Sequence, residues 1–355
     1  MFCKEKSLDF NNEDTTKALG ITWNTNEDIL KFKIDSEFTN LKATKINILS
    51  ASARLFDPLG VLCPIVTRAK ILLQELWLQK LDWDESIPLN LETCWEAFKE
   101  SLLKLHKVSI PRFVNILNDQ KVEIHGFADA SSRAYGCCLY IRAIINDVVV
   151  VRLVTAKSKV APTKTRTLPR LELCAAHLLA KLWNVVKPYL KENSNKLVFW
   201  SDSEIILHWL KMHPSTLNVF VANRVADIQE YTKDATWRHV PTKENPADIV
   251  SRGCNVDELV ESIWFEGPKF LLKNHSEWPI NPHFELNKDE KLLEVKKQKT
   301  ICIAMESEPN IIISLIEKYS SYRKILRIVA YIYKIIDFFT LPKKSKKSLE
   351  LTVKD

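Results

Sequence analysis

The sequence predicts a mixed α/β fold for its central part, with a sheet of five strands flanked by helices. Three strand-like runs follow one another at residues 121–129, 134–142 and 148–155. A long helical pattern, LPRLELCAAHLLAKLWNVVKPYL, then leads to the strand KLVFWSD, and further helices lead to the strand ATWRHVP. Consecutive strands pair antiparallel, and strands joined through a helix lie parallel, so this order of elements gives a mixed sheet.

Length and composition set the first limits on function. The chain has 355 residues, enough for two or three domains, and its 46% hydrophobic and 27% charged residues are ordinary for a globular protein. It contains only 6 glycines and no GxGxxG or GxxxxGK pattern, which argues against a glycine-rich phosphate-binding loop. The net charge of +7 permits a polyanionic partner.

The cysteines and the hydropathy pattern favour a location inside the cell. The 8 cysteines are scattered, with no CxxC pair and no cysteine–histidine cluster at zinc-binding spacing, so we expect free thiols in a reducing compartment. The N-terminus lacks the apolar core of a signal peptide, and no apolar run reaches the roughly 18 residues of a membrane span. The pattern predicts an intracellular protein, in a cytoplasmic particle or in the nucleus, with no membrane partner.

The chain divides into four predicted segments. Residues 1–44 form a short β-containing segment, in which ILKFKI alternates apolar and charged residues. Residues 45–118 are predicted to be helical, with the turn signal DPLG after the first helix. Residues 119–255 hold the five-stranded sheet. Residues 256–355 are a linker with the aromatic run WFEGPKFLLKNHSEWP, an amphipathic helix near 311–339 and a disordered end.

Four acidic residues lie at the ends of predicted elements in the 119–255 segment. Asp129 ends a strand in HGFADAS, and Asp202 ends the strand KLVFWSD. Glu172 lies in the first turns of the long helix, and Asp248 begins the last helix in ENPADIVSR. In a mixed sheet, strand ends and the helices above them converge, so we expect the four carboxylates to lie together. Taken alone, Asp129 is better explained as a turn-capping residue, since Asp and Ser favour strand ends.

A cluster of this kind indicates a metal site. Four carboxylates cannot all be ionised side by side unless cations neutralise them. Hard oxygen ligands suit Mg²⁺, with Mn²⁺ as a possible substitute. Two such ions roughly 4 Å apart would clamp the attacking and leaving oxygens in phosphoryl transfer. The acids therefore predict two Mg²⁺ ions as cofactors.

The sequence around the acids resembles a known family. The segments FADAS, RLELCAA, WSDSEIILHWL and HVPTKENPADIVSRG resemble, in order and spacing, the four acidic signature segments of a ribonuclease H. The run INILSASARLFDPLGVLCPIVTRAKILLQELW, with LGITW before it and LDWDE after it, resembles the region that joins polymerase to ribonuclease H in BEL/Pao-type LTR retrotransposon polyproteins. WFEGPKFLLKNHSEWP and SSYRKILRIVAYIYK resemble the next region of those polyproteins, which leads toward an integrase.

The resemblance implies a ribonuclease H-like domain preceded by a small helical subdomain like the thumb or connection of a reverse transcriptase. It implies hydrolysis of the RNA strand of an RNA–DNA hybrid with two metal ions. Asp129 would bridge the ions, Glu172 and Asp202 would hold the ion nearer the nucleophile, and Asp248 would hold the other. His239 would help product leave, although retroelement members often lack such a histidine and a surface position on a strand is the alternative.

Basic and hydroxyl side chains near the acids are expected to contact the hybrid. Residues 121–255 hold 19 Lys and Arg against 12 Asp and Glu, a net charge of +7 that suits phosphate binding. The side chains expected to contact its backbone are those of Ser131, Lys157, Lys159, Lys164, Arg166, Arg170 and Ser203. A solvated charged face and ordinary turn residues are the alternatives. Trp200 and Trp209 are expected to be core aromatics rather than base-stacking platforms.

Some motifs of a complete retroelement polyprotein are absent. The sequence contains no YxDD polymerase motif, no DSG or DTG aspartic-protease motif and no HHCC zinc pattern. We therefore expect a piece of a polyprotein whose polymerase and integrase partners lie outside this chain. An active ribonuclease H is one interpretation, and a decayed or domesticated fragment that binds nucleic acid without cutting it is the other. An aspartic peptidase is disfavoured by its missing motif.

Overall fold

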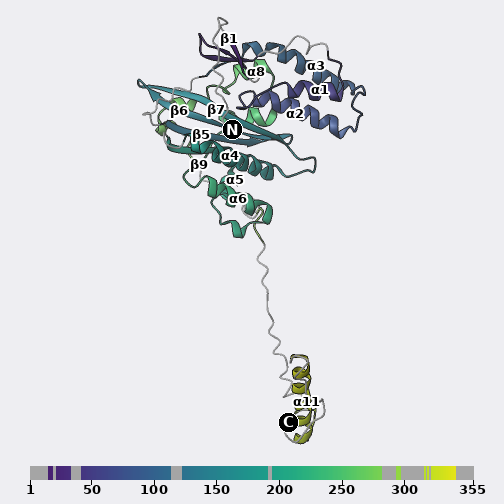
Figure 1. The fold of residues 1–355 in the computed structure, drawn as a ribbon. Helices are drawn as coiled ribbons and strands as arrows, with labels where there is room; N and C mark the ends of the chain where they lie inside the picture. Colours follow the sequence, from purple (N-terminus) through teal and green to yellow (C-terminus); the bar gives the residue numbers. More distant parts are fainter. Residues whose placement is uncertain are drawn as a thin grey trace, which may run out of the picture. The chain divides into compact units, whose positions relative to one another are not determined.

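A computed structural model describes residues 15–18, 21–32, 41–112, 122–190, 194–281, 293–296, 316, 318, 319 and 321–340. Residues 1–296 and 297–355 form two compact units. The first contains two sheets and most of the helices, and the second contains helix α11 (Figure 1). No helix in these described parts is long and apolar enough to cross a membrane.

The larger sheet is the predicted mixed sheet of five strands. Its strands are β5 (Val122–Ala130), β6 (Ala134–Ile145), β7 (Val148–Val160), β8 (Ser194–Ser201) and β9 (Thr236–His239). Their order is β7-β6-β5-β8-β9, with β5, β6 and β7 antiparallel and with β8 parallel to both β5 and β9. The α/β fold class predicted from the sequence is therefore confirmed.

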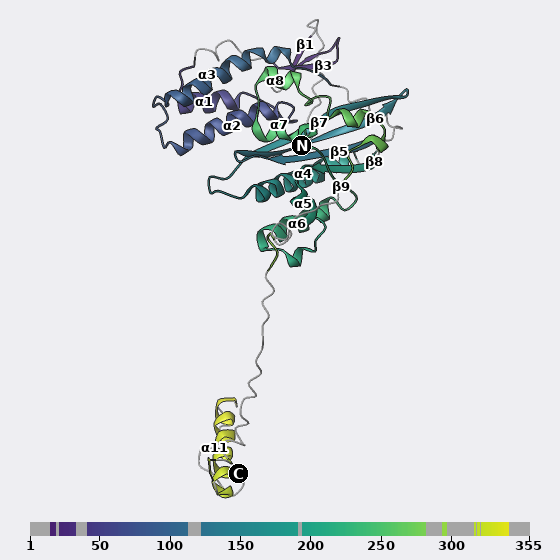
Figure 2. The ribbon, with the colours of Figure 1, turned by 180° about the vertical axis from the view of Figure 1, so that it is seen from behind.

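Helices cover both faces of this sheet (Figures 1 and 2). On one face, α4 (Leu168–Leu190) packs Leu179 and Trp183 against Ile124 and Phe199 of the sheet. Beyond α4 lie α5 (Glu204–Trp209) and α6 (Val219–Tyr231). Trp209 and Trp200 are fully buried, which confirms their predicted place in the core. The opposite face packs against α7 (Ala247–Arg252), α8 (Val256–Glu261) and the N-terminal helices.

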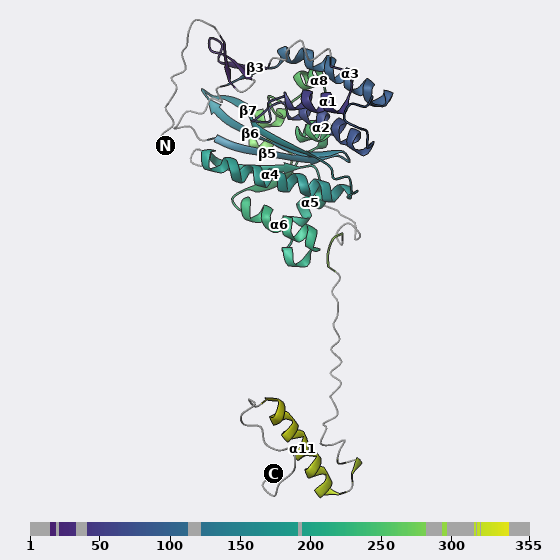
Figure 3. The same cartoon turned by 45° about the vertical axis from the view of Figure 1, so that its right-hand side comes forward.

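The N-terminal helices share one core with the second face of the sheet. They are α1 (Lys45–Ala53), α2 (Cys63–Leu78) and α3 (Leu89–Leu103), followed by a short 3₁₀ helix (Lys104–Lys107). Their apolar side chains, Trp95 among them, belong to the same buried cluster as Phe127 and Trp200 of the sheet. A small antiparallel sheet of β1 (Thr15–Ala18), β2 (Ile21–Asn24), β3 (Ile29–Phe32) and β4 (Ser109–Pro111) lies near these helices (Figure 3).

The sequence DPLG fixes α2 to the sheet. The Asp57 carboxylate accepts hydrogen bonds of 2.8 Å from the backbone N–H groups of Val61 and Leu62 at the start of α2. The Leu59 carbonyl accepts hydrogen bonds from Thr155 Oγ1 (2.7 Å) and the Ala156 N–H (3.0 Å) of β7. Gly60 follows with φ = +77°, and a Cβ placed on it would lie 1.9 Å from the Ala156 carbonyl oxygen. Only glycine therefore permits this close approach of the loop to β7.

We expect Gly60→Ala to lower the free energy of unfolding by about 3 kcal/mol or more. The new Cβ would force a positive φ on an L-residue and would collide with backbone atoms that have no room to move. Urea unfolding followed by tryptophan fluorescence measures the loss. Leu59→Ala is the matched control, because that side chain is 46% exposed and its removal leaves the carbonyl in place. A loss below about 1 kcal/mol for Gly60→Ala would show that the loop does not dock in this way.

The segment after α8 joins the helices to the sheet. Trp264 donates a 2.7 Å hydrogen bond from Nε1 to the Val61 carbonyl of the DPLG loop, and the Tyr140 hydroxyl of β6 donates to the Trp264 carbonyl at 2.6 Å. Two 3₁₀ helices come next, Lys269–Leu272 and His275–Glu277, and Phe270 and Trp278 pack with Trp200. The aromatic run of the predicted linker is therefore part of the main core.

In the second unit, α11 spans Tyr322–Thr340. Helix α11 therefore covers most of the amphipathic helix predicted near 311–339, and residues 311–315, 317 and 320 lie outside the described part of the chain. The predicted disordered end, residues 341–355, also lies outside it.

Candidate active site

Asp129 and Asp202 lie at the ends of neighbouring parallel strands. The β5–β8 register ends with Ala128 opposite Ser201; Asp129 follows Ala128 within β5, and Asp202 follows directly after the end of β8. Because paired strands are about 4.8 Å apart, this register brings the two residues side by side at one edge of the sheet. Asp129 is only 6% exposed.

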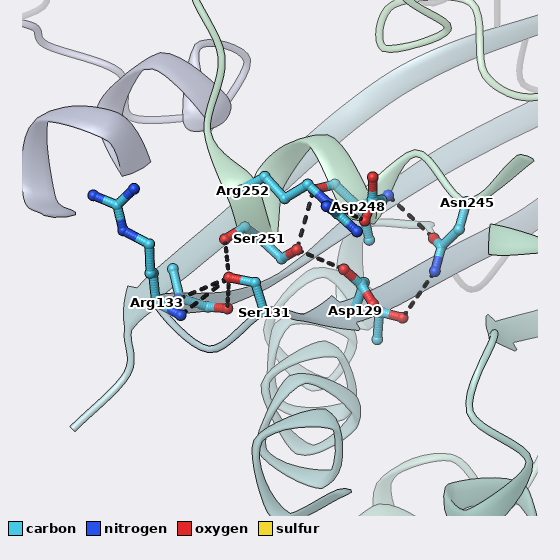
Figure 4. Close-up of polar contacts among 10 residues, drawn as sticks. Asp129, Ser131, Arg133, Asn245, Asp248, Ser251 and Arg252 are labelled. Atoms are coloured by element: carbon cyan, nitrogen blue, oxygen red, sulfur yellow. Dashed lines mark hydrogen bonds and ion pairs between the residues drawn. The ribbon is translucent and has the colours of Figure 1, made fainter. Parts of the chain in front are cut away.

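Helix α7 brings Asp248 to the same edge. In the β5–β6 register Gly136 lies opposite Asp129, and a Cβ on Gly136 would lie 2.3 Å from a methyl of Val250, so this glycine lets α7 approach the sheet. Asn245, just before α7, donates from Nδ2 to the Ala128 carbonyl of β5 at 3.3 Å. Figure 4 shows Asp248 on α7 close to Asp129.

Hydroxyl groups hold α7 to the end of β5. The Ser131 hydroxyl donates to the Ser251 carbonyl at 2.7 Å, and the Ser251 hydroxyl donates to the Asp129 carboxylate at 2.5 Å (Figure 4). Ser251 is fully buried, so this contact is shielded from water. Asp248 accepts a 2.6 Å hydrogen bond from Arg252 Nε, four residues later on α7.

Glu172 completes the group from the other face of the sheet. It lies in the second turn of α4, between the buried residues Leu171 and Leu173. Burial raises the pKa of Glu172, the Ser203 hydroxyl lowers it through a hydrogen bond, and the charge of Asp202 raises it. The interaction with Asp202 shows that these two carboxylates lie within electrostatic reach of each other.

The electrostatics of Asp129 connect three of the acids. Burial first, and then the charges of Asp202 and Asp248, raise the pKa of Asp129 to about 7, although the hydrogen bond from Ser251 opposes the shift. A carboxylate with this environment is partly protonated near neutral pH unless a cation balances the charge. Electrostatic interactions therefore join Asp129 to Asp202 and Asp248, and Glu172 to Asp202.

We expect Asp129 to make the metal-free protein less stable as pH rises. The folded-state pKa of Asp129 is raised to about 7. The stability of the folded state is therefore highest below about pH 4, where Asp129 is protonated in both states, and falls as pH rises through about 7. In chelator, wild type should therefore lose roughly 2–4 kcal/mol relative to Asp129→Asn between about pH 4 and pH 8, at about 1.4 kcal/mol per pKa unit. Urea unfolding of both proteins at several pH values measures this difference. A pH-independent difference would contradict the raised pKa.

The donor set suits a divalent cation, although the carboxylates do not already form a cage. Burial and neighbouring negative charge raise the pKa of Asp129 and Glu172, and a hard cation such as Mg²⁺ would relieve both. Within the described ranges, however, no three His, Cys, Asp or Glu side chains are grouped so that they could hold a metal ion. Asp129 faces Ser251 and Asp248 faces Arg252 instead, so ion binding requires these carboxylates to exchange partners. Their role as metal ligands remains a prediction.

The predicted hydroxyl contacts to substrate have structural partners. The Ser203 side chain is buried and caps α5 by accepting a hydrogen bond from the Ile206 N–H. Ser131 is engaged by Ser251 and Ala134. His239 ends β9 opposite Ser201 of β8, near the acids, and its backbone N–H donates to Asn281 Oδ1 at 2.8 Å.

The predicted basic contacts fall into two groups. Lys157 and Lys159 are exposed on β7, and Lys164 is exposed in the loop before α4. Arg166 and Arg170 instead stack on Phe220 of α6, with guanidinium carbons 4.8 and 5.2 Å from its ring centroid. Arg224 stacks on the same ring at 3.7 Å, which places three guanidinium groups around one aromatic side chain. Arg170 also pairs with Glu294 at 2.5 Å.

Sequence reasoning missed the partners of the acids. Ser251 and Arg252 lie three and four residues after Asp248 in ADIVSRG, the spacing that places side chains on the same side of a helix as Asp248. That spacing was a usable signal for Arg252. The contact of Ser251 with Asp129 joins residues 122 positions apart, and no local pattern predicts it.

The topology and its acidic edge define a ribonuclease H-like domain. Residues 44–203 match the family model described as "Pao retrotransposon-like RNaseH-like domain". This part of the chain therefore matches the family that its resemblance to BEL/Pao-type elements predicted. The matched stretch includes α1–α3, Asp129, Glu172 and Asp202, whereas Asp248 lies beyond it. Curated protein sequences give no significant match.

Several solved structures are similar to parts of the chain. The N-terminal ribonuclease H domain of a Mycobacterium tuberculosis protein is 11% identical, with 40% of this chain and 98% of that one covered at a TM-score of 0.27. LC11-RNase H1 from compost, solved with an RNA/DNA hybrid, is 14% identical, with 37% and 93% covered at 0.27. The foamy viral protease–reverse transcriptase, also solved with a hybrid, is 11% identical, with 64% of this chain but only 29% of that one covered at 0.38.

Proposed function

We propose that this chain is a retroelement-derived ribonuclease H that hydrolyses the RNA strand of RNA–DNA hybrids. The observation that carries the proposal is the pair Asp129 and Asp202 at the in-register ends of parallel strands, with Asp248 and Glu172 in electrostatic reach. A partly buried group of acids destabilises the fold unless cations balance its charge, which favours a functional role for the group. The match of residues 44–203 to an RNaseH-like family supports the same function.

In this proposal Asp129, Glu172, Asp202 and Asp248 hold two Mg²⁺ ions, with Mn²⁺ as a substitute. Bound there, the ions would supply the charge that activates a water and stabilises the leaving oxygen of the scissile phosphate. The chain itself keeps the acids aligned. Asn245, Ser131 and Ser251 fix α7 on the end of β5, so that the acids come from elements that cannot shift independently.

The hybrid is held through its backbone in this proposal. The exposed Lys157, Lys159 and Lys164 and the arginines stacked on Phe220 supply cations on the α4 side of the acids. Stacking on an aromatic ring restricts each guanidinium and so reduces the entropy lost when it binds a phosphate. A hybrid is recognised by the shape of its helix and by its 2′-hydroxyls. Phosphate contacts of this kind fix the position of the hybrid on the protein.

Cleavage of a labelled RNA–DNA hybrid by the full chain tests the proposal. We expect cleavage of the RNA strand in Mg²⁺ or Mn²⁺, none in chelator, and none of double-stranded DNA or single-stranded RNA of the same sequence. Binding of the hybrid without cleavage at any metal concentration would contradict the proposal. It would favour the second candidate, a decayed fragment that only binds nucleic acid, which the pairing of Asp248 with Arg252 also suits.

A further inference from the structure

Arg252 occupies an unusual position in the acidic group. Its Nε donates to Asp248 Oδ1 at 2.6 Å across one turn of α7 (Figure 4). Asp248 and, to a smaller extent, Asp129 and Asp202 raise the pKa of Arg252, so its guanidinium lies within electrostatic reach of three of the four acids. An ordinary surface pair between neighbouring turns of a helix involves only two charges.

The Arg252 side chain is also free to leave. It is 66% exposed, whereas Asp248 is 27% exposed, so withdrawing the guanidinium into water costs little desolvation. It lines a cavity of about 340 Å³ between α2, α3 and α7, together with Arg68 and Arg133. The arginine can therefore move away without disturbing the buried contacts of Ser251 and Asn245 that hold α7 in place.

From these contacts we propose that Arg252 is an internal counter-ion of the acidic site, which neutralises Asp248 in the metal-free protein and must be displaced when a divalent cation binds. The inference rests on the proposed function, because it concerns the same four acids. A guanidinium and a metal ion compete for the same carboxylate oxygen, so each state excludes the other. The competition lowers metal affinity and prevents unbalanced repulsion among the acids when no metal is bound.

Arg133 provides a matched comparison. It lines the same cavity, and its side chain is 57% exposed, but it pairs with Glu75 of α2 at 2.5 Å rather than with an acid of the site. Replacing either arginine removes one positive charge from the same rim of the protein. Only Arg252 should change metal binding if direct competition for Asp248 is the cause.

Mn²⁺ binding by the full chain tests the inference, with isothermal titration calorimetry and electron paramagnetic resonance of free Mn²⁺ as readouts. We expect Arg252→Met to bind Mn²⁺ roughly three- to tenfold more tightly than wild type, from the loss of a partly exposed ion pair. In chelator its melting temperature should fall, because the acids lose their counter-ion. Arg252→Lys should bind Mn²⁺ with an affinity near that of wild type. Arg133→Met should change neither the Mn²⁺ affinity nor the rise in melting temperature that Mn²⁺ produces.

Unchanged or weaker Mn²⁺ binding by Arg252→Met would overturn the inference. If that variant does not fold, Arg252→Gln keeps the length and polarity of the side chain, and the same increase in affinity is expected. Asp248→Asn provides a second check, because Arg252→Gln should have no further effect on Mn²⁺ affinity in that background. If wild type cleaves the hybrid and Arg252→Gln binds Mn²⁺ as wild type does, only the counter-ion role is rejected. If wild type neither binds Mn²⁺ nor cleaves the hybrid, the proposed function is rejected as well.

Discussion

Asp129→Asn is expected to reduce hybrid cleavage by roughly 10³-fold or more while leaving the fold intact. The carboxamide has the shape of the carboxylate and still accepts the hydrogen bond from the Ser251 hydroxyl, so the contact between β5 and α7 survives. The lost negative charge weakens cation binding and with it the stabilisation of charge on the phosphate. Cleavage rates in Mg²⁺ and melting curves in chelator, measured on the same samples, check both parts.

Asp147→Asn is the matched control for this prediction. Asp147 lies in the exposed turn between β6 and β7 of the same sheet, and the same chemical change there should leave cleavage within about twofold of wild type. Full activity of Asp129→Asn would refute the mechanism. A large fall of its melting temperature in chelator would show instead that Asp129 is a structural turn-capping residue, the alternative that its sequence context leaves open.

The sequence was sufficient to predict the sheet and the acids because both depend on local signals. Alternating or continuous apolar runs define β5, β6 and β8, and Asp129 and Asp202 stand at the ends of two of them. Once the strand order is fixed, the parallel β5–β8 register brings these ends together without further information. The helical position of Glu172 likewise follows from the periodicity of α4.

The packing of the N-terminal helices depends on contacts that no local pattern encodes. DPLG is recognisable as a turn, but the reason for its glycine is the Ala156 carbonyl of β7, 96 residues later. Trp264 reaches Val61 across 203 residues. In a sequence, such tryptophans and glycines show only that something is buried or closely approached, and the partner is identified only by the fold.

In the site, too, local sequence predicts the acidic residues, whereas only the fold determines their partners. Residue types at strand ends are sufficient to nominate acids, but whether a carboxylate faces a metal, a hydroxyl or an arginine depends on side chains brought in from other elements. Ser251 meets Asp129 only because Gly136 lets α7 approach the sheet. Whether the acids face a cation or are neutralised by Arg252 therefore depends on α7, which lies outside the stretch that matches the family.

Arg142→Met is expected to lower the free energy of unfolding by about 3–5 kcal/mol, because it removes the arginine partner of a buried carboxylate and leaves only His125 and His275 beside it. Arg142 of β6 is 4% exposed and donates to Glu123 of β5 at 2.9 Å. It also donates to the Leu271 and Lys273 carbonyls at 2.7 and 3.2 Å, which fastens the aromatic segment onto the sheet. Burial opposes ionisation of Glu123, but His125, Arg142 and His275 together lower its pKa to about 2. Urea unfolding near neutral pH measures the loss.

The double variant Arg142→Met with Glu123→Gln separates the charge from the packing. It removes the buried carboxylate as well, so it should recover at least about 1 kcal/mol of the loss, and the remainder reports the two carbonyl contacts. Equal losses in the single and double variants would show that the ion pair contributes nothing. Glu123 and Asp129 lie on the same face of β5, six residues and so about 20 Å apart. Cleavage per folded molecule should therefore be unchanged in both variants, because Glu123 holds the aromatic segment at one end of β5 and the proposed cation site lies at the other end.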